Sequence, residues 1–185
     1  MRVFISGGCK NGKSMLAQRI AVKQGAPLYY IATMIPYDDE DRARIRRHLK
    51  EREGWGFETI ECGRNILNAL DGLPRNKNGR TEGSFLLDSV TALLLNEMFS
   101  EDVAKEGDIS AGERCAKELC ELADRVENIV FVSDFMYSDA ALYDGYTENY
   151  RRALAAVDRV LAERCESAVE VCAGNKIYYK GREWE

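Results

Sequence analysis

Short apolar runs alternate with longer amphipathic segments along the whole chain. Runs that are rich in β-branched and aromatic residues and end at glycine, asparagine or an acidic residue are typical of buried strands. The sequence predicts five such strands, at residues 2–6, 28–33, 57–62, 84–89 and 128–135. Near the C-terminus, residues 168–181 read as an antiparallel hairpin that turns at Gly174-Asn175.

The segments between these strands have apolar residues at helical spacing. They predict helices at 14–24, 38–54, 65–73, 90–100, 111–126 and 147–165. Thr147 is the expected N-cap of the last helix. The second helix opens with acidic residues and continues with basic ones, which is the order that a helix dipole favours. Residues 75–83 and 101–110 are polar or charged and predict connections.

Alternation of strand and helix predicts an α/β fold with a mostly parallel sheet, helices on both of its faces and the antiparallel hairpin at its end. The chain of 185 residues shows no internal repeat and no linker, so we expect one domain over residues 1–185. With 45% hydrophobic residues, the chain can bury a sizeable core.

Charge and cysteine content narrow the classes of function. A formal net charge of −5 argues against general nucleic-acid binding, and the basic cluster at 42–52 reads as a solvated amphipathic helix. No signal peptide and no apolar run of membrane-spanning length is present. The six cysteines form no C-x-x-C pair and the chain has one histidine, so a zinc site is not expected. We expect a cytoplasmic protein whose cysteines are mostly small core residues.

The sequence GGCKNGKS at residues 7–14 fits G-x-x-x-x-G-K-[ST], the phosphate-binding loop (P-loop). It follows a predicted strand and opens a predicted helix, as that motif requires. Lys13 is expected to reach the β- and γ-phosphates of a nucleotide, and Ser14 to place its hydroxyl on Mg²⁺. The predicted nucleotide-binding set is the whole loop: Gly7, Gly8, Cys9, Lys10, Asn11, Gly12, Lys13 and Ser14.

Mg²⁺ in such sites usually takes a further carboxylate from the end of a strand. Asp88 closes the strand 84–89 and is the predicted metal ligand, through a water molecule. Two alternatives stay open: Asp88 caps the helix that starts near Val90, or Asp134 at the end of another strand takes the metal role.

His48 is the sole histidine, and helical spacing places it on the same face as Glu40 and Arg44. A histidine on a charged helix is most often exposed and without a chemical role. The alternative is a nucleophile, because a neutral imidazole can attack phosphorus and form a phosphoramidate.

Several motifs occur together in a fixed order. They are GGCKNGKS, YIAT at 30–33, DDE at 38–40, RIRRH at 44–48, EC at 61–62 and LLDSVTALLLNEMF at 86–99. In this order and spacing they resemble the bifunctional adenosylcobinamide kinase / adenosylcobinamide-phosphate guanylyltransferase family. The resemblance implies a RecA-like P-loop NTPase fold. It also implies that GTP or ATP and adenosylcobinamide are substrates, that Mg²⁺ is the cofactor and that the chain forms a homotrimer with sites between subunits.

The resemblance also implies roles for individual residues. His48 would accept GMP from GTP and pass it to adenosylcobinamide phosphate, and with Lys13 it forms the predicted catalytic pair. Asp88 takes the place of the strand-end acid. Arg44, Arg52 and Glu61 match motif positions and are predicted to border the nucleotide.

The chain departs from the family pattern in two regions. Cys9, Lys10 and Asn11 stand in the loop where G-G-x-R-S-G-K-S is usual, and residues 134–150 replace the usual N-E-V-G-x-G-I-V-P stretch. Ala155 and Asp158 stand where a glycine and an asparagine are usual. A kinase or guanylyltransferase with one activity, or a nucleotide-sensing protein without catalysis, therefore remains an alternative. Four tyrosines of the divergent region either line a substrate pocket or pack on a helix face: Tyr137, Tyr143, Tyr146 and Tyr150.

Overall fold

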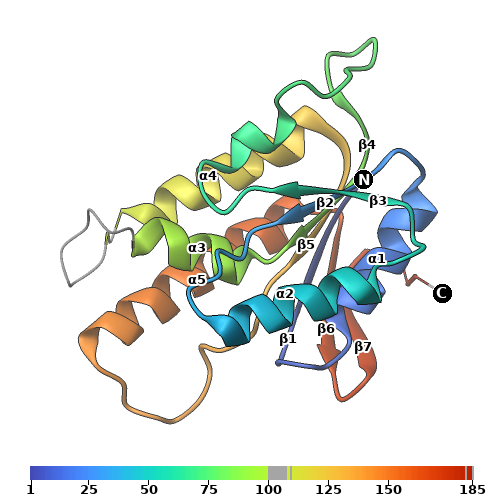
Figure 1. The fold of residues 1–185 in the computed structure, drawn as a ribbon. Helices are drawn as coiled ribbons and strands as arrows, with labels where there is room; N and C mark the ends of the chain where they lie inside the picture. Colours follow the sequence, from blue (N-terminus) through green and yellow to red (C-terminus); the bar gives the residue numbers. More distant parts are fainter. Residues whose placement is uncertain (100–107, 109, 182, 185) are drawn as a thin grey trace.

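The fold is built on a seven-stranded sheet with the order β3-β2-β4-β5-β1-β6-β7, seen in the computed structural model drawn in Figure 1. The structure describes residues 1–99, 108, 110–181, 183 and 184. Six strands pair in parallel and the last pairs antiparallel at the edge. The strands are β1 (Arg2–Gly7), β2 (Leu28–Ala32), β3 (Phe57–Glu61), β4 (Thr81–Asp88), β5 (Val126–Val132), β6 (Ser167–Cys172) and β7 (Asn175–Lys180).

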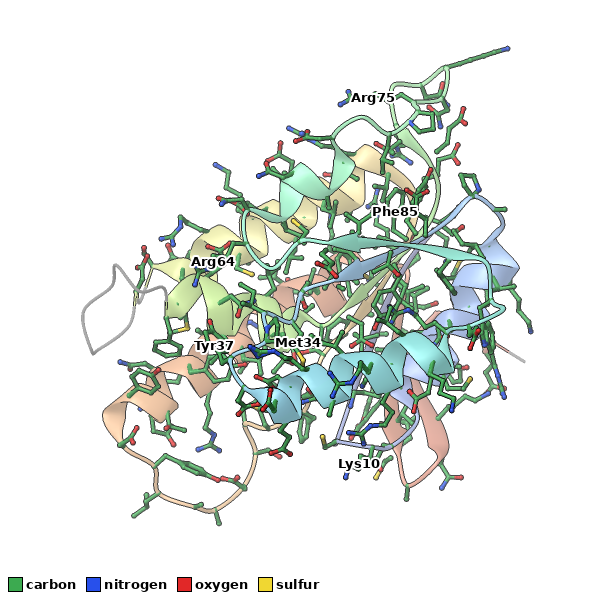
Figure 2. All side chains as sticks on the ribbon, viewed as in Figure 1. Lys10, Met34, Tyr37, Arg64, Arg75 and Phe85 are labelled. Atoms are coloured by element: carbon green, nitrogen blue, oxygen red, sulfur yellow. The ribbon has the colours of Figure 1, made fainter. Side chains whose placement is uncertain are left out.

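Side chains alternate across the sheet and supply two apolar cores, one on each face. The larger core contains residues of α3 (Val90–Met98), α4 (Ala111–Arg125), α5 (Gly145–Arg164) and the 3₁₀ helix η1 (Ile66–Leu70). The smaller core lies on the opposite face, beneath α1 (Lys13–Gln24). Phe85 of β4, labelled in Figure 2, belongs to the larger core and is fully buried. The prediction of a mostly parallel sheet with helices on both faces is confirmed.

Helix α2 (Asp39–Glu51) differs from the other helices because none of its residues is buried. It lies in the foreground of Figure 1, over the ends of the neighbouring strands. The Asp38 side chain caps it by accepting a hydrogen bond from the Asp41 N–H at 2.8 Å. Three acidic residues in its first turn complement the helix dipole. Local interactions therefore hold α2 more than burial does.

Several element boundaries differ from the predictions. The predicted helix at 65–73 is a 3₁₀ helix of five residues. Strand β4 begins inside the predicted loop 75–83, because Thr81 already pairs with Val126 of β5. The predicted helix 90–100 ends at Met98, and most of the predicted connection 101–110 lies outside the described residues.

Two sequence predictions about local geometry are wrong. Thr147 is not the cap of α5, because the Asp144 side chain accepts a hydrogen bond from the Thr147 N–H at 2.7 Å and the helix begins at Gly145. The hairpin turns at Ala173-Gly174, one residue earlier than predicted. Both residues have positive φ, 48° and 78°, which is the conformation that a two-residue hairpin turn requires.

The cysteines divide between the core and the surface. Cys62, Cys115 and Cys165 are buried, Cys120 is half-buried, and Cys9 and Cys172 are exposed. The expectation that most of them are core residues therefore holds for half, and all six are free thiols. No helix in the described part of the chain is long and apolar enough to cross a bilayer.

Candidate active site

The P-loop joins β1 to α1 at the carboxyl edge of the parallel sheet, where open α/β sheets bind their ligands. Gly7 is required by a close approach, since a Cβ there would lie 2.3 Å from the Val171 carbonyl oxygen of β6. Gly12 precedes α1 with φ of 89°, a conformation that favours glycine. The loop and the amino end of α1 thus form the geometry that binds a phosphate group. Figure 2 shows Lys10 in this loop, and its side chain is exposed.

Lys13 points back into the loop and is only 6% exposed. Its ammonium group donates to the Gly8 carbonyl oxygen at 2.7 Å and to Asp134 Oδ1 at 2.8 Å. Asp134 follows the end of β5, the strand beside β1, which explains why the two side chains meet. The structure therefore places Asp134, the alternative metal ligand, in an ion pair with the P-loop lysine.

A pocket at the ends of β2 and β4 brings together four residues that the sequence singled out. His48 and Arg44 come from α2, Arg52 follows that helix, and Asp88 ends β4. His48 is half-buried and Arg44 is exposed. Met34, which Figure 2 shows in the connection between β2 and α2, lines the same pocket. One imidazole, two guanidinium groups and one carboxylate thus share a single pocket.

Tyr30 on β2 organises this pocket, although the sequence assigned it no role. Its hydroxyl donates to Asp88 Oδ2 at 2.8 Å, and the Arg52 guanidinium stacks 3.5 Å from the centre of its ring. Burial, followed by the charge of Asp88, raises the pKa of Tyr30, so this hydroxyl remains a proton donor. Arg52 also donates to Thr59 Oγ1 at 3.3 Å and is only 8% exposed. The motif YIAT contains Tyr30, but the contact itself depends on the pairing of β2 with β4.

The alternative role of Asp88 as a helix cap is not observed. Ser89 caps α3, since its hydroxyl accepts a hydrogen bond from the Ala92 N–H at 3.2 Å. The Asp88 backbone carbonyl accepts from the Thr33 N–H at 3.3 Å, which holds the end of β4 against the end of β2. The Asp88 carboxylate is thus directed toward the pocket and Tyr30.

The remaining predicted residues lie around these two groups. Cys9 is exposed and Ser14 is half-buried, and Asn11 donates from its side-chain amide to the Val171 carbonyl oxygen at 3.4 Å. Glu61 ends β3 and is exposed, but it is not among the residues that line the pocket with His48. The structure therefore groups Lys13 with the loop and His48 with Asp88, and it does not bring Glu61 into either group.

The four tyrosines of the divergent segment make contacts within the protein. Tyr150 is buried and donates to the Thr91 carbonyl oxygen at 2.9 Å, and Tyr146 stacks on Phe99 with ring centres 4.0 Å apart. Tyr143 lies 4.6 Å from the Arg151 guanidinium. In the same segment, the Tyr137 hydroxyl donates to Asp158 Oδ2 at 3.2 Å. The interpretation as a packed helix face applies best to Tyr150, whereas Tyr143 and Tyr146 are both 43% exposed.

Comparison with known proteins identifies a family for almost the whole chain. A family model described as cobinamide kinase / cobinamide phosphate guanyltransferase matches residues 3–178. The chain is 29% identical over 181 residues to a bifunctional adenosylcobalamin biosynthesis protein, CobP, of Pseudomonas aeruginosa. That alignment covers 98% of both chains. A second relative, the bifunctional adenosylcobalamin biosynthesis protein CobU of Salmonella typhimurium, is 30% identical over 62% of this chain and 61% of its own length.

Solved structures share the fold at low sequence identity. The protein PH0250 of Pyrococcus horikoshii OT3 superposes with a TM-score of 0.54 at 13% identity, over 98% of this chain and 87% of that one. A RadB recombinase superposes with a TM-score of 0.50 at 14% identity, over 98% and 81% of the two chains. These similarities confirm the predicted RecA-like P-loop fold.

Proposed function

The chain belongs to the cobinamide kinase / cobinamide phosphate guanyltransferase family, and we propose that it performs both reactions on adenosylcobinamide. In the first, a hydroxyl oxygen of adenosylcobinamide attacks the γ-phosphorus of GTP or ATP. The bond to the β-phosphate breaks, a nucleoside diphosphate leaves, and the hydroxyl proton is released. In the second, GMP is transferred from GTP to the phosphate made in the first reaction.

For the kinase step, the P-loop supplies position and positive charge. The loop N–H groups and the amino end of α1 orient the phosphates, and the Lys13 ammonium offsets charge on the transferred group. Lys13 is already held at the loop by Gly8 and Asp134, so little reordering precedes phosphate binding. Positioning and charge stabilisation of this kind supply most of the rate in phosphoryl transfer.

Mg²⁺ is the cofactor that this reaction class uses, and the residues present fit it. Ser14, half-buried at the start of α1, offers a hydroxyl and Asp88 a carboxylate, both of them the hard oxygen donors that Mg²⁺ prefers. Asp88 accepts from Tyr30 through Oδ2, so Oδ1 can serve a cation or its water. Mg²⁺ held by Ser14 and Asp88 would supply positive charge that offsets the negative charge of the nucleotide phosphates.

For the second step we propose that His48 is the residue that carries GMP. An imidazole nitrogen attacks the α-phosphorus of GTP, the bond to the β-phosphate breaks and pyrophosphate leaves. A phosphate oxygen of adenosylcobinamide phosphate then attacks the same phosphorus, the N–P bond breaks and His48 is restored. Arg44 and Arg52 line the same pocket and offer donors for the phosphate oxygens.

One observation carries this proposal: the sole histidine shares a pocket with two arginines and with Asp88, the acid at the end of β4. An idle histidine on a solvated helix needs no such neighbours. A nucleotide sensor would need the phosphate loop but not the imidazole.

The test is exposure to GTP labelled at the α-phosphate. We expect one GMP per active chain, bound to His48 by a bond that survives base and breaks in acid, as a phosphoramidate does. His48→Asn should abolish labelling and leave the kinase step intact, because Lys13, Ser14 and Asp88 are unchanged. Arg46→Gln, an exposed change on the same helix, is the matched control and should label normally.

The alternatives give other outcomes. Phosphorylated cobinamide without a labelled protein would indicate a kinase with one activity. Binding of GTP without product would indicate a nucleotide sensor. A GMP adduct on a lysine would overturn the role of His48.

We also propose that the chain acts as a cytoplasmic homotrimer. The six free thiols suit a reducing compartment. Apolar side chains exposed on the divergent segment, Phe135, Met136 and Leu142, offer surface for a subunit contact. Sedimentation should then give three times the chain mass of 20.9 kDa, and a monomer at micromolar concentration would contradict the trimer.

A further inference from the structure

A buried carboxyl group lies behind the P-loop and takes no part in the reactions described above. Asp158 of α5 is only 2% exposed. Its Oδ2 accepts from the Ser133 hydroxyl at 3.0 Å and from the Tyr137 hydroxyl at 3.2 Å. Within the described residues, its Oδ1 accepts no hydrogen bond. Burying a carboxyl group with so few partners is costly, which calls for a reason specific to this position.

The hydrogen bonds that end on Asp158 form a chain with one direction. The Asp134 N–H donates to Thr91 Oγ1 at 2.8 Å, and the Thr91 and Ser133 hydroxyl oxygens lie 3.5 Å apart. The Ser133 hydrogen is directed to Asp158, so the Thr91 hydroxyl is the donor between these two. The donors in this series thus point toward the carboxylate, and the contact between Thr91 and Ser133 is its longest link.

The series of hydrogen bonds begins at Asp134, which is the ion-pair partner of the P-loop lysine Lys13. The Asp134 backbone N–H donates to Thr91 Oγ1, and the Asp134 carboxylate accepts a hydrogen bond from the Lys13 ammonium. On the basis of the proposed function, we propose that Asp158 is a positioning residue, which fixes Asp134 and thereby the place of Lys13 in the phosphate site. Through Tyr137 it also anchors the divergent segment to α5.

This role makes the phosphate site depend on pH. Burial raises the pKa of Asp158 to about 7, while the hydrogen bonds from Ser133 and Tyr137 oppose that rise and the charge of Asp134 adds to it. The other titratable groups that it influences are Cys115 of α4 and Tyr150 of α5, and both have raised pKa values. Asp158 is therefore the group of this cluster that titrates near neutral pH.

Protonation of Asp158 weakens the acceptor at which this series of hydrogen bonds ends. A neutral carboxyl group is a weaker acceptor, so Ser133 and Tyr137 are held less firmly below about pH 7. Asp134 then loses part of its fixed position, and Lys13 with it. We expect nucleotide use to improve as pH rises through this region.

The experiment compares the wild-type protein with Asp158→Asn, whose amide oxygen still accepts hydrogen bonds but does not titrate. The quantity measured is kcat/KM for the nucleotide in cobinamide phosphorylation at pH 6 and pH 8. A group of pKa 7 goes from roughly one tenth to nine tenths ionised over this range, so the ratio of wild type to variant should rise by up to about ninefold. Titration of the nucleotide itself cancels in that ratio.

Two further variants make the result specific. Tyr137→Phe removes one hydrogen bond that lowers the pKa of Asp158, so the transition should remain and move to higher pH. Asp139→Asn changes an exposed carboxyl group of the same segment. The ratio of kcat/KM between the wild type and this variant should be the same at pH 6 and pH 8. The proposal would be overturned if the ratio of kcat/KM between the wild type and Asp158→Asn does not change with pH and the variant differs only by a lower melting temperature.

A second measurement distinguishes failure of the proposed function from failure of the proposed role of Asp158. If the wild-type protein does not phosphorylate cobinamide, the same ratio of wild type to variant is measured on the association constant for GTP, which depends on Lys13 but not on the cobinamide. A ratio that rises with pH there supports the role of Asp158, and a flat one refutes it.

Discussion

Lys13 combines near-complete burial with two short hydrogen bonds, to Gly8 and Asp134. The carboxylate of Asp134, which is 22% exposed, is paired with the Lys13 ammonium. A phosphate group entering the loop therefore meets an ammonium that is already oriented. The affinity of the loop for phosphate should depend on this one side chain more than on its exposed neighbours.

Lys13→Ala tests that dependence. We expect kcat/KM for the nucleotide to fall by at least about 100-fold, the usual effect of removing a donor aimed at developing charge. Circular dichroism should show an intact fold. Lys23→Ala, an exposed change in the last turn of α1 and outside the predicted nucleotide-binding set, is the matched control and should change kcat/KM by less than about threefold. Equal effects of the two substitutions would mean that Lys13 does not bind phosphate.

Asp158 should also make the free energy of unfolding depend on pH. Its ordinary pKa of 3.8 rises to about 7 on folding, so between these values the unfolded chain has lost a proton that the folded chain keeps. The free energy of unfolding therefore falls as pH rises through this window and levels off above it. Relative to Asp158→Asn, the wild-type protein should lose about 2–3 kcal/mol between pH 5 and pH 8. Urea unfolding at both pH values measures this difference, and a constant difference would contradict the raised pKa.

Among single residues, the sequence alone assigns a role to those that belong to a contiguous motif. The P-loop requires Gly7, Gly12 and Lys13 in fixed places, so their positions follow from spacing alone. Tyr30 and Ser133 could not be assigned in the same way. Their partners, Asp88 and Asp158, come from other elements and meet them only through strand pairing and helix packing.

Among the elements, α2 carries the proposed GMP acceptor and is the helix with the least burial. None of its residues is buried, whereas α4 buries a stripe that includes Cys115, Leu119 and Leu122. Helices that bury little open at low free-energy cost. Movement of α2 would change the pocket that holds His48, so the nucleotidyl step should be sensitive to how α2 is held.

Removing the cap of α2 tests this. Asp38→Ala should destabilise the helix by about 1 kcal/mol and speed amide hydrogen exchange in α2 by roughly fivefold. Asp144→Ala removes the cap of α5 and is the matched control, with faster exchange confined to the first turn of α5. Hydrogen exchange followed by mass spectrometry resolves the two. No change in α2 on Asp38→Ala would show that packing, rather than the cap, holds that helix.

Element types followed from the sequence more reliably than element ends. The apolar runs predict strands because a sheet buried on both faces demands them. The start of β4 at Thr81 did not follow, since polar residues of 75–83 join the sheet only through contact with β5. The hairpin turn was displaced because Ala173 adopts positive φ, which is uncommon for alanine.

On the scale of the whole molecule, the two ends of the chain share one core. Met1 packs against the smaller core and Trp184 belongs to it, beside residues of α1. Trp184 is only 7% exposed, and its backbone N–H donates to the Tyr178 hydroxyl at 2.9 Å. Residues from both ends of the described chain thus contribute to the core beneath α1, which supports our proposal of one domain.

Trp184→Ala should therefore destabilise the entire protein, and not only its C-terminus. Truncating a buried tryptophan leaves a cavity against α1 and typically costs about 3–5 kcal/mol. Unfolding should remain a single transition that moves to lower urea concentration, and the affinity for GTP of the folded fraction should change little. Tyr179 on β7 is 70% exposed, so Tyr179→Ala is the matched control and should cost less than about 0.5 kcal/mol. If Trp184→Ala costs no more than this control, the end of the chain does not belong to the core; if unfolding splits into two transitions, the chain is not one cooperative domain.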